Sequence, residues 1–540
     1  MKHTPLKTAL SLLLALLLAA TSLSVSFASN EQPEDPVPVI YVIGRTAIYD
    51  DPASPDRRTL AKAGSDEIEA AVKEALPYAA KAVLFGQWDE YADETYGLLM
   101  QFFDGYALDE NGNVANSSGN DFHWSEETLP RDYQSDNPYT YRFEYDARLS
   151  PLEVADQLND FIEAVKRVTG KDKVSIIGRC LGACVMMAYL YKYQEGVGFT
   201  GVENVCFYDS SFHGIEMLEA AMSGSVTIEA DAASAFLDGY DLETGEEALD
   251  VILPLTLTML EETYGMELTV EFLEKFYENI KYSLFRRFLM SSLGTAPGYW
   301  SMVYEGYDDA KAYLFCDEGD DVKYAGLIAK LDDYRENVQL RGDEILAGME
   351  AAGVGVGVVC KYGFRGYPVY EGASELSDGV TGLKKQSFGA TVSTIDGTLG
   401  KSYIAAKQAE GLGDYISPDR QIDASTCRFA DSTWFIKNYE HNPFWDCVNP
   451  LLVSICRKEG FNVKDDPRFP QFMYLESSSS VVPMTEENAD PDGQITHEGS
   501  EPVKKDPLMA FVGFLKYLAE LFRLFAEAFA SGQFDQLIRR

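Results

Sequence analysis

The chain has 540 residues, 46% hydrophobic and 24% charged, which is too long for one compact core and indicates a large domain with insertions or two domains with tails. Its formal net charge of −41 at pH 7 disfavours nucleic acid and anionic membrane surfaces as partners. Eight cysteines lie scattered along the chain without a CxxC pair or zinc-ligand spacing, so we expect no disulfide framework, no metal and no cofactor.

The N-terminus has the pattern of a secretory signal peptide. Lys2 and Lys7 precede an apolar run over residues 9–20, and small residues follow at 26–28. This order is typical of a signal peptide cleaved near a small residue, and the run is short for a membrane span. We therefore expect residues 1–28 to be removed and the protein to be secreted, with possible association to the cell surface.

Apolar strand patterns then alternate with helical ones. The continuous run at 37–44, closed by glycine, is typical of a strand buried on both faces. Further strands are expected at 140–145, 173–178, 205–208, 354–360 and 433–437, with helices at 152–168 and 181–194. Such alternation predicts an α/β fold with a mostly parallel sheet and helices on both faces, built from residues 35–214 and 351–475.

Three other segments differ from this pattern. Residues 215–350 have mostly helical spacing, so we expect a helical cap inserted into the α/β domain. Residues 476–506 are rich in Ser, Glu, Asp and Pro and are expected to form a disordered linker. Residues 507–540 predict an amphipathic helix that packs on the protein, on a partner or peripherally on a membrane.

The most informative motif is Gly178-Arg179-Cys180-Leu181-Gly182, between a predicted strand and a predicted helix. This is the G-x-Nu-x-G spacing of a nucleophile elbow, in which a sharp turn exposes the central side chain. The N–H of Leu181, at the helix N-terminus, would point at a substrate oxyanion. The alternative interpretation is a buried structural cysteine in a glycine-containing turn.

The segments 143–148 and 173–182 resemble the lipase and lecithin:cholesterol-acyltransferase-like branch of the α/β-hydrolases. That branch has Tyr-Asp-Trp-Arg, a helix and then Gly-His-Ser-Met-Gly-Gly; here Ala147, Arg179 and Cys180 replace the Trp, His and Ser. The resemblance implies an α/β-hydrolase fold and cleavage of a carboxylic ester, from a small molecule or a lipid, through an acyl-enzyme.

A thiol nucleophile needs a base, and the family order nucleophile–acid–histidine requires a histidine after the last strand. His441 directly follows the predicted strand at 433–437 and is the candidate that fits. The resemblance of residues 417–425 to the lipase segment Gly-Asp-Gly-x-Val-Pro-x-x-Ser implies Asp419 as the acid. Asp423 is the second choice and Asp396 the third.

Two further positions have predicted roles. The loop after the first strand should supply a second oxyanion donor, and the N–H of Arg45 is the candidate. His213 follows the strand after the elbow, where lipase-like proteins border the acyl pocket, and a purely structural role is equally compatible.

The same predicted residues allow three functions. A lipase- or esterase-like hydrolase is the first hypothesis, and an acyltransferase or thioesterase with the same Cys-His-Asp set is the second. The third is a hydrolase-like binding protein without catalysis, which the replacements at Arg179 and Cys180 motivate.

Overall fold

The computed structural model describes residues 36–490, except 46, 61–70, scattered positions between 72 and 84, 116, 132–138, 230–265 and 443. The predicted signal peptide at 1–28 and the predicted C-terminal helix at 507–540 lie outside the described residues. None of the helices in the described ranges is both long enough and apolar enough to cross a membrane.

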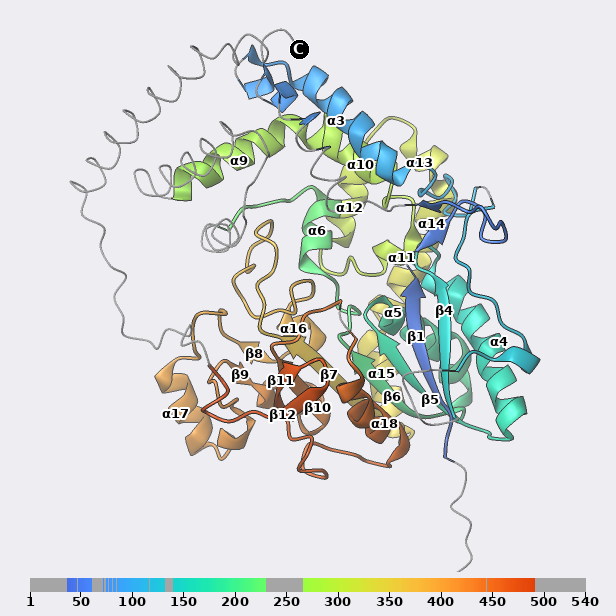
Figure 1. The fold of residues 1–540 in the computed structure, drawn as a ribbon, viewed down its shortest axis with the longest axis vertical. Helices are drawn as coiled ribbons and strands as arrows, with labels where there is room; N and C mark the ends of the chain where they lie inside the picture. The colour runs from blue at the N-terminus through green and yellow to red at the C-terminus, as the bar shows by residue number, and fades with distance from the viewer. Residues whose placement is uncertain are drawn as a thin grey trace, which may run out of the picture. The chain divides into compact units, whose positions relative to one another are not determined.

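The centre of the fold is an eight-stranded sheet with the order β4-β1-β5-β6-β7-β10-β11-β12 (Figure 1). Neighbouring strands are parallel except β11 and β12, which are antiparallel. The strands are β1 (Val39–Arg45), β4 (Thr140–Asp146), β5 (Val174–Arg179), β6 (Val202–Tyr208), β7 (Gly355–Tyr362), β10 (Thr433–Lys437), β11 (Phe472–Ser477) and β12 (Ser480–Pro483). The predicted α/β class is confirmed, and the strands predicted at 37–44, 140–145, 173–178, 205–208, 354–360 and 433–437 are present with bounds close to the predicted ones.

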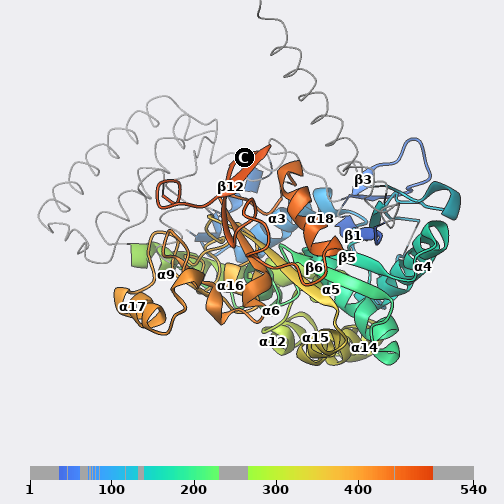
Figure 2. The same ribbon diagram turned by 90° about the horizontal axis from the view of Figure 1, so that it is seen from below.

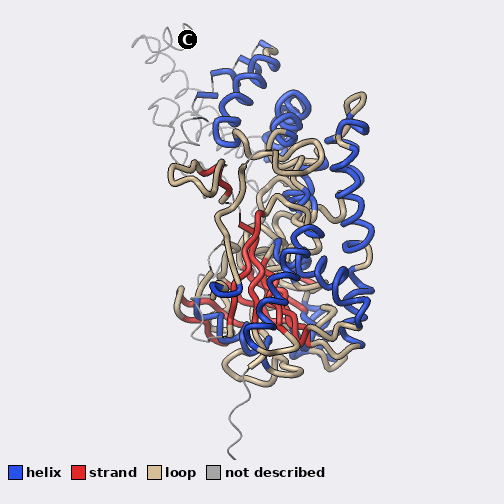
Figure 3. Tube along the Cα trace, turned by 90° about the vertical axis from the view of Figure 1, so that its right-hand side faces the viewer, coloured by secondary structure: helices blue, strands red, loops and turns tan. Residues whose placement is uncertain are grey.

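Both faces of the sheet are buried, because successive side chains of a strand point to opposite sides. In β1, Ile40 and Val42 pack into one apolar core while Val39 and Tyr41 pack into the other. Figure 3 shows the strands as a central layer with helices beside them. This double burial explains why the run at 37–44 is continuously apolar.

Helices from different parts of the chain cover the two faces of the sheet. The first core contains α4 (Pro151–Thr169) and α5 (Leu181–Tyr189), and the second contains α18 (Asn449–Arg457). Figure 2 shows α5 and α18 on opposite sides of the strands. Helix α4 ends at Gly170, whose φ of 69° is the left-handed conformation that glycine adopts without strain.

The segment predicted as a cap contains helices and no strand among its described residues. Its first helix, α6, packs against α12, and Figure 1 shows both at the end of the sheet to which the β1 arrow points. The helices are α6 (Glu216–Ser223), α9 (Met266–Ile280), α10 (Arg287–Met290), α11 (Pro297–Trp300), α12 (Tyr307–Leu314), α13 (Asp320–Lys323), α14 (Ala325–Tyr334) and α15 (Gly342–Ala351).

The remaining elements are one long helix and several short helices and strands. They are α3 (Trp88–Phe103), α16 (Leu383–Gln386), α17 (Lys401–Ala409) and the strands β2 (Ile48–Tyr49), β3 (Thr59–Leu60), β8 (Thr391–Val392) and β9 (Ile422–Asp423). One boundary differs from expectation: β12 lies inside the segment 476–506 that was predicted to be a disordered linker. Its backbone pairs with β11 and thereby extends the sheet, so this part of the segment is ordered.

Candidate active site

Cys180 lies in a strained turn between the end of β5 and the start of α5. Its φ of 49° and ψ of −121° are far from the conformations that side chains other than glycine prefer. Such strain persists only where the surrounding packing enforces it, and it is expected at a nucleophile elbow. Two glycines, Gly178 and Gly182, flank this turn.

Both elbow glycines lie where a Cβ atom has no room. A Cβ on Gly182 would lie 2.0 Å from the Val42 carbonyl oxygen of β1, and a Cβ on Gly178 would lie 2.7 Å from the Ala183 Cα. The start of α5 therefore packs directly on the backbone of β1. These contacts give a physical reason for glycine at both ends of the motif.

His441 pairs with Asp378 in the loops that follow β10 and β7. The His441 Nδ1 lies 2.7 Å from the Asp378 Oδ2, and the His441 N–H donates to the Asp378 carbonyl oxygen at 2.9 Å. The N–H groups of Val380 and Thr381 donate to the other carboxylate oxygen of Asp378 at 3.0 and 2.8 Å. Both side chains are buried, so the carboxylate is fixed and aimed at the imidazole.

The Asp378 carboxylate contacts the His441 imidazole at Nδ1, and the imidazole and the Cys180 thiol lie close enough for each to shift the pKa of the other. Burial acts to raise the pKa of the Cys180 thiol, but the charge of His441 and its hydrogen bond hold that pKa below the usual value. Burial acts to lower the pKa of His441, whereas Cys180 and Asp378 together raise it above the usual value. The two side chains therefore stabilise each other's charged forms, the thiolate and the imidazolium.

Two other groups, Ser211 and Asp209, also affect the pKa of the Cys180 thiol. The Ser211 hydroxyl lies 3.2 Å from the Cys180 Sγ, and its hydrogen bond also lowers the thiol pKa. The carboxylate of Asp209 acts in the opposite direction, because a second negative charge disfavours the thiolate. The net result of these opposing effects is a Cys180 pKa below its usual value.

Alkylation of Cys180 should therefore persist at low pH. A thiol with an ordinary pKa of about 8.5 loses roughly 75-fold in reactivity between pH 8 and pH 6, because only the thiolate reacts. Since the pKa of Cys180 is lowered, we expect a smaller loss than this over the same range. Iodoacetamide labelling with peptide mapping measures it, with a cysteine-containing peptide as the control; a 75-fold loss at Cys180 would contradict the ion pair.

The carboxylates proposed from the sequence lie elsewhere. Asp419 accepts hydrogen bonds from the Lys437 Nζ and the Tyr362 hydroxyl, both at 3.0 Å. Asp423 accepts from the Tyr403 hydroxyl at 2.7 Å, and Asp396 contacts Arg365. The prediction of Asp419 as the partner of His441 is wrong: the carboxylate at His441 is that of Asp378.

The error follows from how far each aspartate lies from the end of β7 along the chain. Asp378 is the first aspartate after β7 and lies in a Ser-Asp-Gly turn, whereas Asp419 was chosen by similarity to a lipase segment much farther along. Loops at the carboxyl ends of neighbouring parallel strands meet at one edge of the sheet, so closeness to the end of β7 was the signal that could have found Asp378.

The two expected oxyanion donors have different surroundings. Leu181 is the first residue of α5, so its N–H has no acceptor within the helix and lies beside the nucleophile. The Arg45 carbonyl oxygen accepts from the Ala147 N–H at 3.1 Å, on the side of β1 that pairs with β4. The role of the Arg45 N–H as the second donor stays a prediction.

The Arg45 side chain is occupied as well, in ion pairs with Glu144 at 2.9 Å and Asp121 at 3.1 Å. His213 packs edge-on against Phe388 and Tyr304, with ring centroids 4.7 and 5.4 Å apart. Burial lowers the pKa of His213, so its environment is apolar and favours the neutral imidazole. This packing is compatible with either role expected for it.

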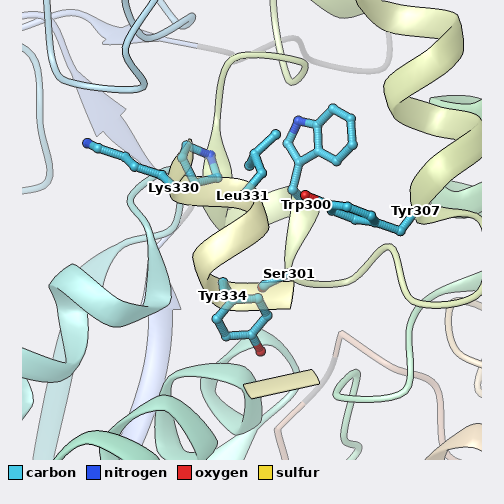
Figure 4. A pocket seen from close by; sticks show the side chains of 7 residues that line it. Trp300, Ser301, Tyr307, Lys330, Leu331 and Tyr334 are labelled. Carbon is cyan, nitrogen blue, oxygen red and sulfur yellow. The ribbon is translucent and has the colours of Figure 1, made fainter. Parts of the chain in front are cut away.

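A narrow crevice lies between α11, α12 and α14, away from the Cys180 thiol. It has an empty volume of about 190 Å³ but no space wide enough for a water molecule, and the residues shown in Figure 4 line it. Figure 4 shows the rings of Trp300 and Tyr307 side by side and the Tyr334 ring turned away from them. Neither Cys180 nor His441 contributes to its lining, so it is not a substrate pocket for that pair.

Comparison with known proteins adds no identification. No model of a known protein family matches the sequence, and no curated protein matches it significantly. In the part of the chain that the structure describes, no group of three or more His, Cys, Asp and Glu side chains is arranged to hold a metal ion.

Proposed function

We propose that this chain is a secreted hydrolase of the α/β-hydrolase type that cleaves carboxylic ester bonds through Cys180, His441 and Asp378. The observation that supports this is the convergence of a strained thiol, an imidazole and a buried carboxylate from the loops that follow β5, β10 and β7. Loops at the carboxyl ends of parallel strands are where such sheets bind ligands. In this proposal residues 215–350 form the cap over the site.

The chemistry follows from this arrangement in two steps. The Cys180 thiolate attacks the ester carbonyl carbon, and the developing oxyanion faces the N–H of Leu181. The tetrahedral intermediate collapses, the C–O bond breaks, and protonated His441 donates its proton to the leaving alcohol. Water then attacks the resulting thioester with His441 as the base, and the carboxylic acid and the thiolate are released.

Asp378 has an indirect part in both steps. Its carboxylate holds the imidazole through Nδ1, so Nε2 faces the sulfur, and it stabilises the imidazolium. The substrate class that suits this site is a neutral small-molecule or lipid ester.

Acyl transfer is the second candidate, and the identity of the nucleophile favours it. An acyl group on Cys180 is a thioester, which reacts readily with thiol and amine acceptors as well as with water. The same residues would then act as an acyltransferase, or as a thioesterase when the donor is itself a thioester. A binding protein without catalysis would form no acyl-enzyme.

The test is to trap the acyl-enzyme on the full chain. Incubation with p-nitrophenyl acetate and p-nitrophenyl octanoate should release one burst of p-nitrophenol per chain, followed by slower turnover. Peptide mapping after acid quench should place the acyl group on Cys180, and Cys180→Ala should show neither burst nor adduct. The chain-length preference separates an esterase from a lipase.

Other results would change the proposal. Label on the exposed Cys316 without label on Cys180 would overturn it. A burst without turnover, with release on addition of a small thiol or amine, would favour the acyltransferase. No burst and no adduct would leave the binding protein as the remaining hypothesis.

A further inference from the structure

Two buried charges and one partly exposed charge lie beside the turn at Cys180. Lys361 on β7 and Asp209 after β6 are fully buried, and the Lys361 Nζ lies 2.8 Å from the Asp209 Oδ2. Arg179, the residue before Cys180, brings its Nε within 3.3 Å of the same oxygen. Three adjacent strands therefore contribute one charge each to a single cluster, Arg179–Asp209–Lys361.

The cluster contacts the backbone of both reacting residues. The Lys361 Nζ and an Arg179 Nη each donate to the His441 carbonyl oxygen at 2.9 Å. The other oxygen of Asp209 accepts from the Cys180 N–H at 3.1 Å. One carboxylate therefore accepts from the Cys180 backbone N–H and also pairs with the two cations that donate to the His441 carbonyl oxygen.

Such a cluster is a poor way to stabilise a fold. Removing charges from water costs about as much as their pairing returns, and apolar side chains of similar volume often stabilise as well or better. Asp209 also has a φ of 40°, a strained conformation for a residue with a side chain. Both features are expected of residues that fix the geometry of a site and contribute little to the stability of the fold.

We infer that the Arg179–Asp209–Lys361 cluster is a positioning device that fixes His441 against Cys180. This inference rests on the proposed function and extends it to residues that do not touch the substrate. It also gives Arg179, which stands where the lipase-like branch has histidine, a role in this chain: its guanidinium holds the loop after β10 through the carbonyls of His441 and Asn442.

The test replaces Lys361 by methionine, which keeps the length of the side chain and removes its charge. Lys437→Met is the matched control, because Lys437 also pairs with a buried aspartate and donates to a carbonyl oxygen, at Ala489, without contacting His441. Alkylation of Cys180 as a function of pH is the main readout. Thermal unfolding, and kcat and KM for p-nitrophenyl esters, accompany it.

In Lys361→Met the carbonyl of His441 loses a donor and Asp209 loses a neutralising cation, so both changes act to raise the thiol pKa. We expect the alkylation profile to move about one unit to higher pH, so that alkylation well below the pKa falls about tenfold. We also expect kcat to fall about 10- to 100-fold with KM within about threefold, as for misplaced catalytic groups. In Lys437→Met the alkylation profile should stay within about twofold of the wild type, even if the protein unfolds at a lower temperature.

Equal alkylation profiles in the two lysine variants would overturn the inference. Should Lys361→Met fail to fold, Arg179→Met decides in its place, with Arg179→Lys expected to recover part of the lost reactivity because it keeps the cation. A wild type that turns over no ester, while Lys361→Met still shifts the alkylation profile, would defeat the proposed hydrolysis and leave the positioning role intact.

Discussion

Asp378→Asn is expected to lower kcat for ester hydrolysis by about 10²–10⁴, the range seen when the acid of a catalytic triad becomes an amide. The asparagine side chain cannot balance the charge of an imidazolium, and its NH₂ group can donate to Nδ1 and impose the wrong tautomer. His441 would then present a protonated nitrogen to the thiol and could not accept its proton. Steady-state kinetics with p-nitrophenyl esters measures the loss.

The matched control for this variant is Asp419→Asn. Asp419 is also buried and also pairs through hydrogen bonds, but with Lys437 and Tyr362 instead of His441. Its loss should lower the free energy of unfolding while kcat per folded molecule stays within about threefold, as expected outside the reacting groups. If Asp419→Asn removed activity and Asp378→Asn did not, the assignment of the acid would be reversed.

Gly182→Ala is expected to prevent folding of the α/β core. The added Cβ would lie 2.0 Å from the Val42 carbonyl oxygen. The Cβ is fixed to the backbone of α5 and the oxygen belongs to the backbone of β1, so no side-chain rotation can relieve this clash. Either α5 moves away from β1 or the turn at Cys180 distorts. We expect a loss of more than about 4 kcal/mol in the free energy of unfolding, beyond the usual range for point substitutions.

Circular dichroism and thermal unfolding of the purified chain measure this effect. Gly97→Ala is the control, since Gly97 lies in the exposed part of α3 and a Cβ there meets no atom within 4 Å. Alanine should be neutral or stabilise that helix by up to about 1 kcal/mol. A Gly182→Ala protein with wild-type unfolding would show that α5 and β1 are not packed as closely as the structure has them.

Local patterns carried most of what the sequence predicts correctly. The strand run at 37–44, the helix beginning at Pro151 and the elbow around Cys180 all depend on residues close together in the chain. Burial on both faces demands continuous apolar residues, and a sharp strand–helix turn demands glycine two residues either side of its centre. The sequence also limits the base to His441, because histidines are few and the order of the elements is fixed.

The pairing of the acid was decided by tertiary structure alone. Several aspartates follow β7, and each could serve a histidine as far as composition and local pattern are concerned. The loop after β7 bends so that Asp378 meets both the side chain and the backbone N–H of His441. Asp419, farther along, is drawn to Lys437 instead.

The Arg179–Asp209–Lys361 cluster, like the pairing of Asp378 with His441, depends on tertiary structure. Cys180 and His441 are recognisable from short stretches of chain, because a turn or a strand end places them. Arg179, Asp209 and Lys361 come from three strands that are distant in sequence and adjacent only in the sheet. By itself the sequence determined the α/β class and the tight strand–helix turn at Cys180, and it singled out Cys180 and His441 as candidates. Only the order of the strands decided which carboxylate pairs with His441 and which charges contact its backbone, because contacts across a sheet depend on strand order rather than on local pattern.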